Sequence, residues 1–174
     1  MTLETSNKFI AKLLEVAQAE IGVKDEGNNR GARVEEYKAV VGGSDDELPW
    51  CMSLVQFIIK RTEEATGINL GENVKRTEHC LTFWDAMSKY QTQEPEVGRI
   101  MIMRHGSTPQ GHTGIVEALM VNGQVRTIEG NTGASGGREG DGVYLKSRNL
   151  ITPKTGLHII GFIDLKSVPE VNFT

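Results

Sequence analysis

The stretch Leu48-Pro49-Trp50-Cys51-Met52-Ser53-Leu54-Val55-Gln56-Phe57-Ile58-Ile59-Lys60 places a cysteine where a loop turns into a helix. Pro49 fixes its own φ and disfavours helix at the residue before it. Apolar residues then recur at helical spacing, so we expect a helix that begins near Trp50 and has Cys51 in its first turn. Unpaired amides and the helix dipole favour a thiolate there, which makes Cys51 a candidate nucleophile. The alternative is a small buried hydrophobic residue, as most free cysteines are.

A cysteine nucleophile needs a base, and a histidine opens a predicted strand in Gly111-His112-Thr113-Gly114-Ile115-Val116. The neighbouring glycines remove side chains that would obstruct a substrate, so Gly111 is a candidate for lining the substrate site. Two alternatives remain: His112 is an ordinary loop histidine, or His105 in the preceding loop is the base. We favour His112 because His105 lacks the strand and the glycines.

A polar partner for the histidine is expected from the next strand. A hairpin turn is predicted at Asn122-Gly123, and residues 124–131 then pair back, bringing Glu129 or Asn131 beside His112. The two residues have the same parity, so they point to one face if the strand runs through both. Either one could orient the imidazole. The plainer alternatives are a solvent-facing carboxylate for Glu129 and a turn former for Asn131.

The order of the predicted elements indicates the fold class. Helical patterns, including those over residues 3–21 and 78–87, lie in the first half of the chain, and strand patterns lie in the second half. We therefore expect an α+β protein in which N-terminal helices pack on a C-terminal antiparallel sheet. At 174 residues, the chain fits one domain, and neither repeats nor a separate wall-binding module are apparent.

Three motifs together, Pro49-Trp50-Cys51, Gly111-His112-Thr113-Gly114-Ile115-Val116 and Ile128-Glu129-Gly130-Asn131-Thr132, resemble the CHAP superfamily of cysteine, histidine-dependent amidohydrolases/peptidases. The resemblance covers roughly residues 5–165. It implies a papain-like fold of the NlpC/CHAP type. It also implies a peptidoglycan hydrolase in which the motifs supply a cysteine nucleophile, a histidine base and two polar partners: Cys51, His112, Glu129 and Asn131.

The chemistry implied by the resemblance is cleavage of an amide bond through a thioester. The bond is either the one between muramic acid and L-alanine, cut by an amidase, or a peptide bond, cut by an endopeptidase. The Cys51 amide is one expected oxyanion donor. Trp50, Asn28 and Asn29 are candidates for binding substrate, although a plain turn is the favoured interpretation of the asparagine pair. The alternative function is a non-catalytic wall-binding or structural module with the same fold.

Metal and cofactor sites are not expected. Some members of the superfamily carry an acidic residue just before the cysteine and bind calcium, whereas Trp50 stands there in this chain. The acidic segment 44–47 is better explained as solvated loop than as a cation site. The His79-Cys80 pair suggests zinc, but no second cluster lies at ligand spacing, so we expect Cys80 to pack in the core. The glycine-rich segment 133–142 lacks a nucleotide-binding pattern and is predicted to be a loop beside Asn131.

The composition limits the partners. The formal net charge of −4 gives no basic footprint for nucleic acid or an anionic membrane, and we expect a monomer whose partner is bacterial peptidoglycan. No signal peptide or apolar run of membrane-spanning length is visible. We therefore expect synthesis in a cytoplasm and delivery to the wall by holin-dependent release, on a virion or as a secreted effector. A phage lysin is the preferred interpretation.

Overall fold

The computed structural model describes residues 1–43, 47–133 and 140–171. Four α-helices in this part of the chain precede the main strands: α1 (Leu3–Ala19), α2 (Ala32–Ala39), α3 (Cys51–Thr66) and α4 (Cys80–Ala86). Short 3-10 turns occur at η1 (Gly71–Asn73), η2 (Ser88–Tyr90) and η3 (Leu165–Ser167). The predicted acidic loop at 44–46 and the centre of the glycine-rich segment, 134–139, lie outside the described residues.

Six strands form one antiparallel sheet: β1 (Gln91–Thr92), β2 (Ile100–His105), β3 (Gly111–Met120), β4 (Gln124–Thr132), β5 (Gly142–Asn149) and β6 (Leu157–Ile163). Their spatial order is β1-β6-β2-β3-β4-β5. The predicted hairpin is present, because β3 and β4 pair antiparallel around the turn that contains Gly123. Helices first and a sheet second confirm the predicted α+β class, in an arrangement consistent with a papain-like fold.

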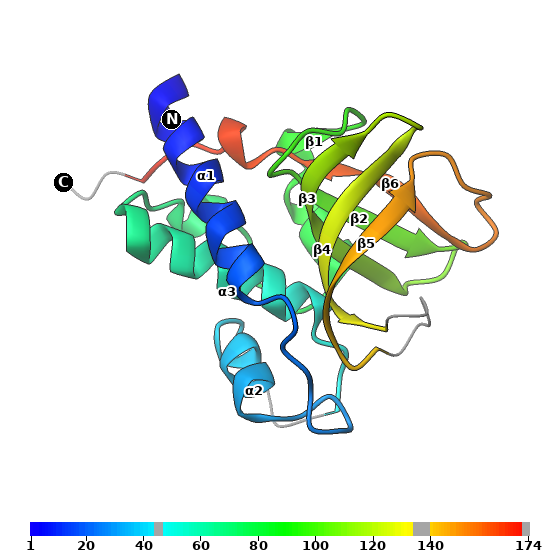
Figure 1. Ribbon diagram of the computed structural model, residues 1–174. Helices are drawn as coiled ribbons and strands as arrows, with labels where there is room; N and C mark the ends of the chain where they lie inside the picture. The colour runs from blue at the N-terminus through cyan, green and yellow to red at the C-terminus, as the bar shows by residue number, and fades with distance from the viewer. Residues whose placement is uncertain (44–46, 134–139, 172–174) are drawn as a thin grey trace.

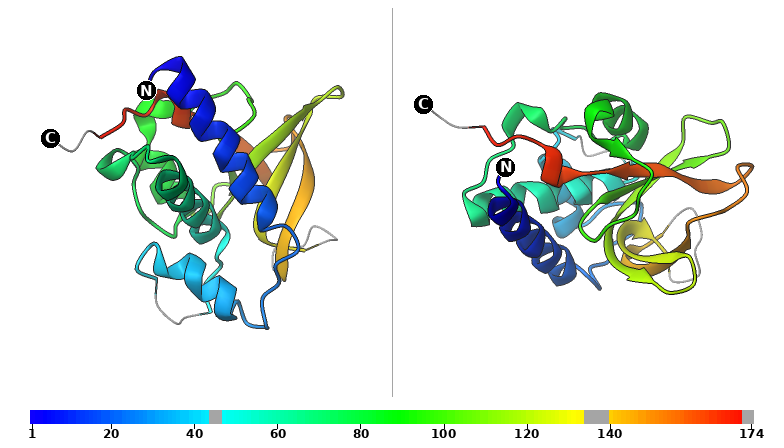
Figure 2. Two further views of the ribbon diagram at one scale, coloured as in Figure 1. Left: turned by 60° about the vertical axis from the view of Figure 1, so that its left-hand side comes forward. Right: turned by 90° about the horizontal axis from the view of Figure 1, so that it is seen from above.

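The long helices α1 and α3 lie together on one side of the sheet, and α2 lies at one end of α3 (Figure 1). The turned views in Figure 2 show the same separation of helices from strands. Side chains from α1 and α3 and from the strand face toward them form the larger hydrophobic core, which includes Leu13, Leu54, Ile102 and Ile128. A smaller cluster holds Met101, Met103, Val116, Val125 and Phe162. The sheet therefore carries buried apolar side chains in two separate clusters.

Helix α3 is the central helix of the fold. It contacts α1, α2, β3 and β4, and all of its first nine residues are buried because most positions there carry apolar side chains. Thr62 is buried too, and its hydroxyl donates to the carbonyl of Ile58. The helix ends at Gly67, whose left-handed φ of 73° suits a residue without a β-carbon. This packing holds the N-terminus of α3, where Cys51 lies, against the sheet.

Candidate active site

Cys51 is the first residue of α3, one position after the predicted start at Trp50, which is the N-cap. Its side chain is buried, and the thiol is not in a disulfide. A hydrogen bond with the Cys80 thiol is the largest influence on the pKa of Cys51 and lowers it. Burial opposes this shift, while His112 and the backbone amide of Met52 reinforce it, so the pKa of Cys51 lies well below its ordinary value. These contacts therefore favour the thiolate form of Cys51.

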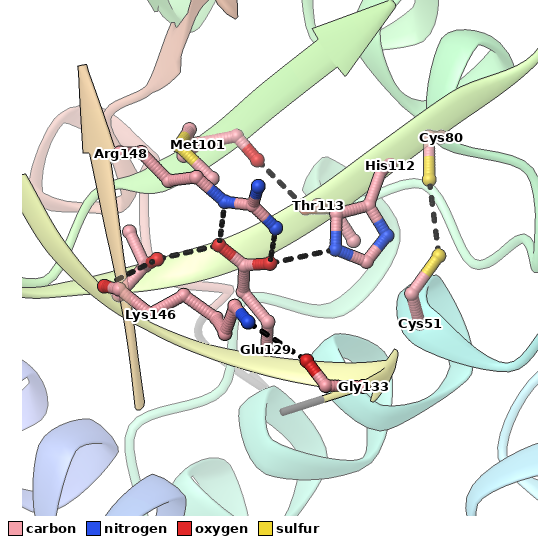
Figure 3. Close-up of polar contacts among 10 residues, drawn as sticks. Cys51, Cys80, Met101, His112, Thr113, Glu129, Gly133, Lys146 and Arg148 are labelled. Atoms are coloured by element: carbon pink, nitrogen blue, oxygen red, sulfur yellow. Dashed lines mark hydrogen bonds and ion pairs between the residues drawn. The ribbon is translucent and has the colours of Figure 1, made fainter. Parts of the chain in front are cut away.

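Cys80 is one residue of the site that the sequence analysis did not identify, and Arg148 is another. Cys80 is the first residue of α4 and is buried as predicted, but its Sγ atom lies 3.7 Å from Sγ of Cys51 (Figure 3). The hydrogen bond with Cys51 and burial together raise the pKa of the Cys80 thiol well above its ordinary value. The geometry allows either thiol to donate in this hydrogen bond, and the opposite pKa shifts favour Cys80 as the donor and Cys51 as the acceptor. The only signal in the sequence was that the chain has two cysteines.

His112 lies near the start of β3, between Cys51 and Glu129. Its Nε2 atom is 2.8 Å from Oε2 of Glu129, and the other ring nitrogen, Nδ1, faces the side of Cys51 (Figure 3). Burial alone would lower the pKa of His112, but hydrogen bonds with Cys51 and Glu129 outweigh it and raise the pKa to about 9. These contacts therefore favour a Cys51 thiolate beside a His112 imidazolium.

Glu129 on β4 is completely buried and receives several donors. The guanidinium of Arg148 on β5 donates to both carboxylate oxygens, with distances of 2.8 Å and 2.5 Å, and the hydroxyl of Thr127 donates at 2.6 Å. Burial would raise the pKa of Glu129, but the hydrogen bonds from Arg148 and His112 outweigh this effect and lower the pKa to about 2. The carboxylate is therefore ionised, and it orients His112 through Nε2.

Glycines leave the room that these side chains need. A β-carbon on Gly114 would lie 2.5 Å from Cγ of Glu129, and one on Gly130 would lie 2.6 Å from Leu54 and 2.7 Å from Trp50. One on Gly111 would lie 2.7 Å from Cβ of Cys80. The missing side chain of Gly111 therefore makes room for α4, and its part in lining the substrate site stays a prediction.

Asn131 does not share the orientation of Glu129. The register between β4 and β5 shifts between Glu129 and Thr132, and Asn131 has a left-handed φ of 52°. The predicted common face required a regular strand through both residues, and this bulge breaks the alternation. Asn131 is buried, and its Oδ1 atom has no hydrogen-bond partner among the described residues. Glu129 is thus the residue that orients His112.

The side chains predicted to bind substrate make contacts within the protein. Trp50 is fully buried, stacks at a tilt on Tyr37 and faces Gly130, so its indole does not line an open site. Asn28 and Asn29 both have left-handed φ values, and their side-chain amides donate to Glu47, which precedes Cys51. These contacts fit the turn interpretation, and they fasten the loop that leads into α3. The predicted use of Trp50 for direct substrate contact is therefore corrected.

The competing histidines and the zinc alternative find no support in the geometry. His105 ends β2 and is exposed, and the side chain of His79 is 67% exposed. Within residues 1–43, 47–133 and 140–171, no group of three or more histidine, cysteine or acidic side chains is placed to hold a metal ion. Within the same ranges, no helix is both long and apolar enough to cross a membrane.

Comparison with known families agrees with this site. A model of the CHAP domain family matches residues 43–131, a range that contains Cys51, Cys80, His112 and Glu129. The chain therefore belongs to the CHAP domain family. Members of this family are generally cysteine- and histidine-dependent amidohydrolases or peptidases, and the domain indicates peptidoglycan hydrolase activity in general. A sequence search against curated proteins finds no match.

Proposed function

We propose that the protein hydrolyses an amide bond of peptidoglycan through a thioester on Cys51. The observation that carries this proposal is the placement of His112 between Cys51 and Glu129, with its Nε2 atom 2.8 Å from Oε2 of Glu129 and its Nδ1 atom facing Cys51, at the junction of α3 with β3 and β4. A thiolate, a proton donor and a carboxylate that orients the donor are the three groups that cysteine acyl transfer needs.

In the first half of the reaction, the Cys51 thiolate attacks the amide carbonyl carbon, and the oxygen becomes an oxyanion. The backbone amide of Cys51 at the start of α3 is the expected donor to that oxyanion. The C–N bond then breaks, and the His112 imidazolium gives its proton to the leaving amine. The product is a thioester on Cys51 and a neutral imidazole.

In the second half, neutral His112 accepts a proton from water, and the resulting hydroxide attacks the thioester carbonyl. The carboxylic acid leaves, and Cys51 returns as a thiolate beside the imidazolium. Glu129 stabilises the positive charge on His112 in both halves without accepting its proton, because the pKa of Glu129 is about 2.

Two bonds fit this chemistry: the amide between muramic acid and L-alanine, and a peptide bond of the stem or cross-bridge. The decisive experiment incubates the purified protein and Cys51→Ala with peptidoglycan from several bacteria and identifies the released fragments by mass spectrometry. Release that disappears in the variant supports the proposal, and the new termini distinguish an amidase from an endopeptidase. Release that survives in Cys51→Ala contradicts it.

Two histidine variants provide a matched control. His112→Ala should abolish release, whereas His105→Ala should retain it, because His105 is exposed at the end of β2. If every protein, wild type included, is silent while wild type still binds the wall, a non-catalytic wall-binding module replaces the enzyme as the better explanation.

For delivery, we propose a phage lysin that reaches the wall after holin-dependent release, with a virion component or a secreted effector as the other routes. Expression inside a susceptible bacterium tests this. A lysin of this kind should lyse the cells only when a holin is co-expressed. Lysis without a holin would favour a secreted route.

A further inference from the structure

Two sulfur atoms lie together at the site, and the proposed hydrolysis uses only one of them chemically. Sγ of Cys51 and Sγ of Cys80 are 3.7 Å apart, both thiols are free, and both residues are buried. A disulfide has an S–S distance of about 2.05 Å, so the two sulfurs need to approach each other by about 1.7 Å to form one. Cys51 and Cys80 are the only cysteines in the chain, so no other intramolecular pairing competes.

A glycine on β3 allows the backbone at Cys80 to lie close to the sheet. Gly111 on β3 faces Cys80, and a β-carbon on Gly111 would lie 2.7 Å from Cβ of Cys80. The start of α4 is thereby allowed close to β3, beside His112 and opposite the start of α3 (Figure 3). The two cysteines begin two different helices, so their proximity is a feature of the tertiary fold and does not follow from their spacing in the chain.

The two thiols differ in reactivity. Cys80, His112 and the Met52 amide all lower the pKa of Cys51 and so favour its thiolate, the form that attacks an electrophile. The pKa of Cys80 is raised by Cys51 and by burial, which favours its protonated form. An attacking cysteine beside a second cysteine that resolves the oxidised product is the arrangement found in thiol redox sensors.

We propose that Cys51 and Cys80 form a reversible disulfide when the protein meets a peroxide, and that this bond switches the hydrolase off while protecting Cys51 from irreversible oxidation. The effect of the disulfide on activity rests on the proposed function. Formation of the disulfide itself does not depend on it.

The reaction with hydrogen peroxide balances in two steps. The Cys51 thiolate attacks one peroxide oxygen, the O–O bond breaks, and the products are a sulfenic acid on Cys51 and hydroxide, which takes up a proton to form water. The sulfur of Cys80 then attacks the sulfenic sulfur; hydroxide leaves and combines with the Cys80 proton as a second water. Two thiols have lost two electrons and two protons, and one peroxide has become two waters.

A dithiol reductant reverses the change. Its thiolate attacks one sulfur of the disulfide and forms a mixed disulfide, and its second thiol then releases the protein with both cysteines reduced. Hydrolysis cannot proceed in the oxidised form, because the sulfur of Cys51 is bonded to that of Cys80 and is no longer a thiolate that can attack a carbonyl carbon. Activity should therefore follow the redox state of the surroundings.

The test treats reduced wild-type protein and Cys80→Ser with a small excess of hydrogen peroxide and follows intact mass, free thiols in denaturant and hydrolysis. Wild type should lose about 2 Da and both thiols, and dithiothreitol should restore the mass and nearly all of the activity. Cys80→Ser should instead gain about 32 or 48 Da on Cys51. The fraction of its own starting activity that dithiothreitol restores should be at least about tenfold smaller than the fraction restored in wild type.

Digestion under non-reducing conditions should yield a peptide pair joined through Cys51 and Cys80. The proposal is overturned if wild type gains the same oxygen atoms at the same rate as Cys80→Ser, or if its disulfides join two molecules. If Cys80→Ser does not fold, the mass of peroxide-treated wild type is sufficient as a test: loss of about 2 Da supports the proposal, and a gain of oxygen contradicts it. A protein that forms the bond but never cleaves peptidoglycan would disprove the proposed function and leave the disulfide standing.

Discussion

The side chain of Glu129 crosses the backbone of Gly114 so closely that a β-carbon there would lie 2.5 Å from Cγ of Glu129. Gly114 is on β3, two residues after His112, and Glu129 is on β4. The absent side chain lets the side chain of Glu129 pass close to Gly114 and reach Nε2 of His112. A glycine that looked like part of a family motif therefore has a direct steric role in orienting the base.

We expect Gly114→Ala to damage both stability and catalysis. The added methyl must push Glu129 away or spread β3 and β4, and such overpacking typically costs 1–3 kcal/mol, so we expect a loss of about 2 kcal/mol in the free energy of unfolding. Displacing the carboxylate should also lower kcat at least about tenfold. Urea unfolding and hydrolysis assays measure the two effects.

Gly156→Ala is the matched control, because a β-carbon at Gly156 would have nothing within 4 Å. Its free energy of unfolding should stay within about 0.5 kcal/mol of wild type. Equal losses in the two variants would show that the crowding at Gly114 has no special role.

Activity should decline as the pH rises through about 9. The pKa of His112 is raised to about 9, and above it the imidazolium that protonates the leaving amine is lost. The acid limb belongs to the Cys51 thiolate, whose pKa is lowered most by Cys80, so Cys80→Ala should shift that limb to higher pH. The rate of alkylation by iodoacetamide against pH measures the thiolate without any substrate. An acid limb unmoved by Cys80→Ala would contradict the hydrogen bond between the two thiols.

Arg148 is a positioning residue that acts through Glu129. Arg148→Met removes two donors from a buried carboxylate, so the pKa of Glu129 should rise and the imidazolium should lose its fixed partner. We expect kcat to fall about 10- to 100-fold with KM nearly unchanged, and the acid limb of activity to move to higher pH. Arg148→Lys should recover part of the loss.

Arg126→Met provides the comparison for Arg148, since Arg126 on β4 pairs with Glu117 at the surface. Its effect on kcat should be negligible, because exposed ion pairs contribute about 0–1 kcal/mol to stability and Arg126 does not touch the site. Similar kinetic losses in both variants would refute a specific role for Arg148.

Glu129 should also make the fold sensitive to acid. Its pKa is about 2 in the folded protein against 4.5 for an unperturbed carboxyl, so folding favours the ionised form. The associated stability is fully present above pH 4.5 and is lost as the pH falls toward 2; the difference corresponds to about 3 kcal/mol. Unfolding measured between pH 6 and 2 should therefore show a steeper fall for wild type than for Glu129→Gln. Parallel curves would contradict the shifted pKa.

Much of the fold and the catalytic series could be predicted because the signals are local. Pro49 and the apolar spacing after it place Cys51 at the start of a helix, and an Asn-Gly turn between two strands places Glu129 beside His112. In each case, hydrogen bonding between near neighbours in the chain fixes the geometry. The order of helices and strands then indicates the α+β class.

Tertiary packing decided the rest. Cys80 meets Cys51 because the missing side chain of Gly111 lets α4 approach β3, and no spacing in the chain records that contact. Arg148 reaches Glu129 only through the pairing of β5 with β4. The bulge at Asn131 broke an alternation that holds only for a regular strand, and burial of Trp50 followed from the core around Tyr37. The sequence thus determined elements whose hydrogen bonds are local, while the fold alone decided which side chains from distant elements share one buried site.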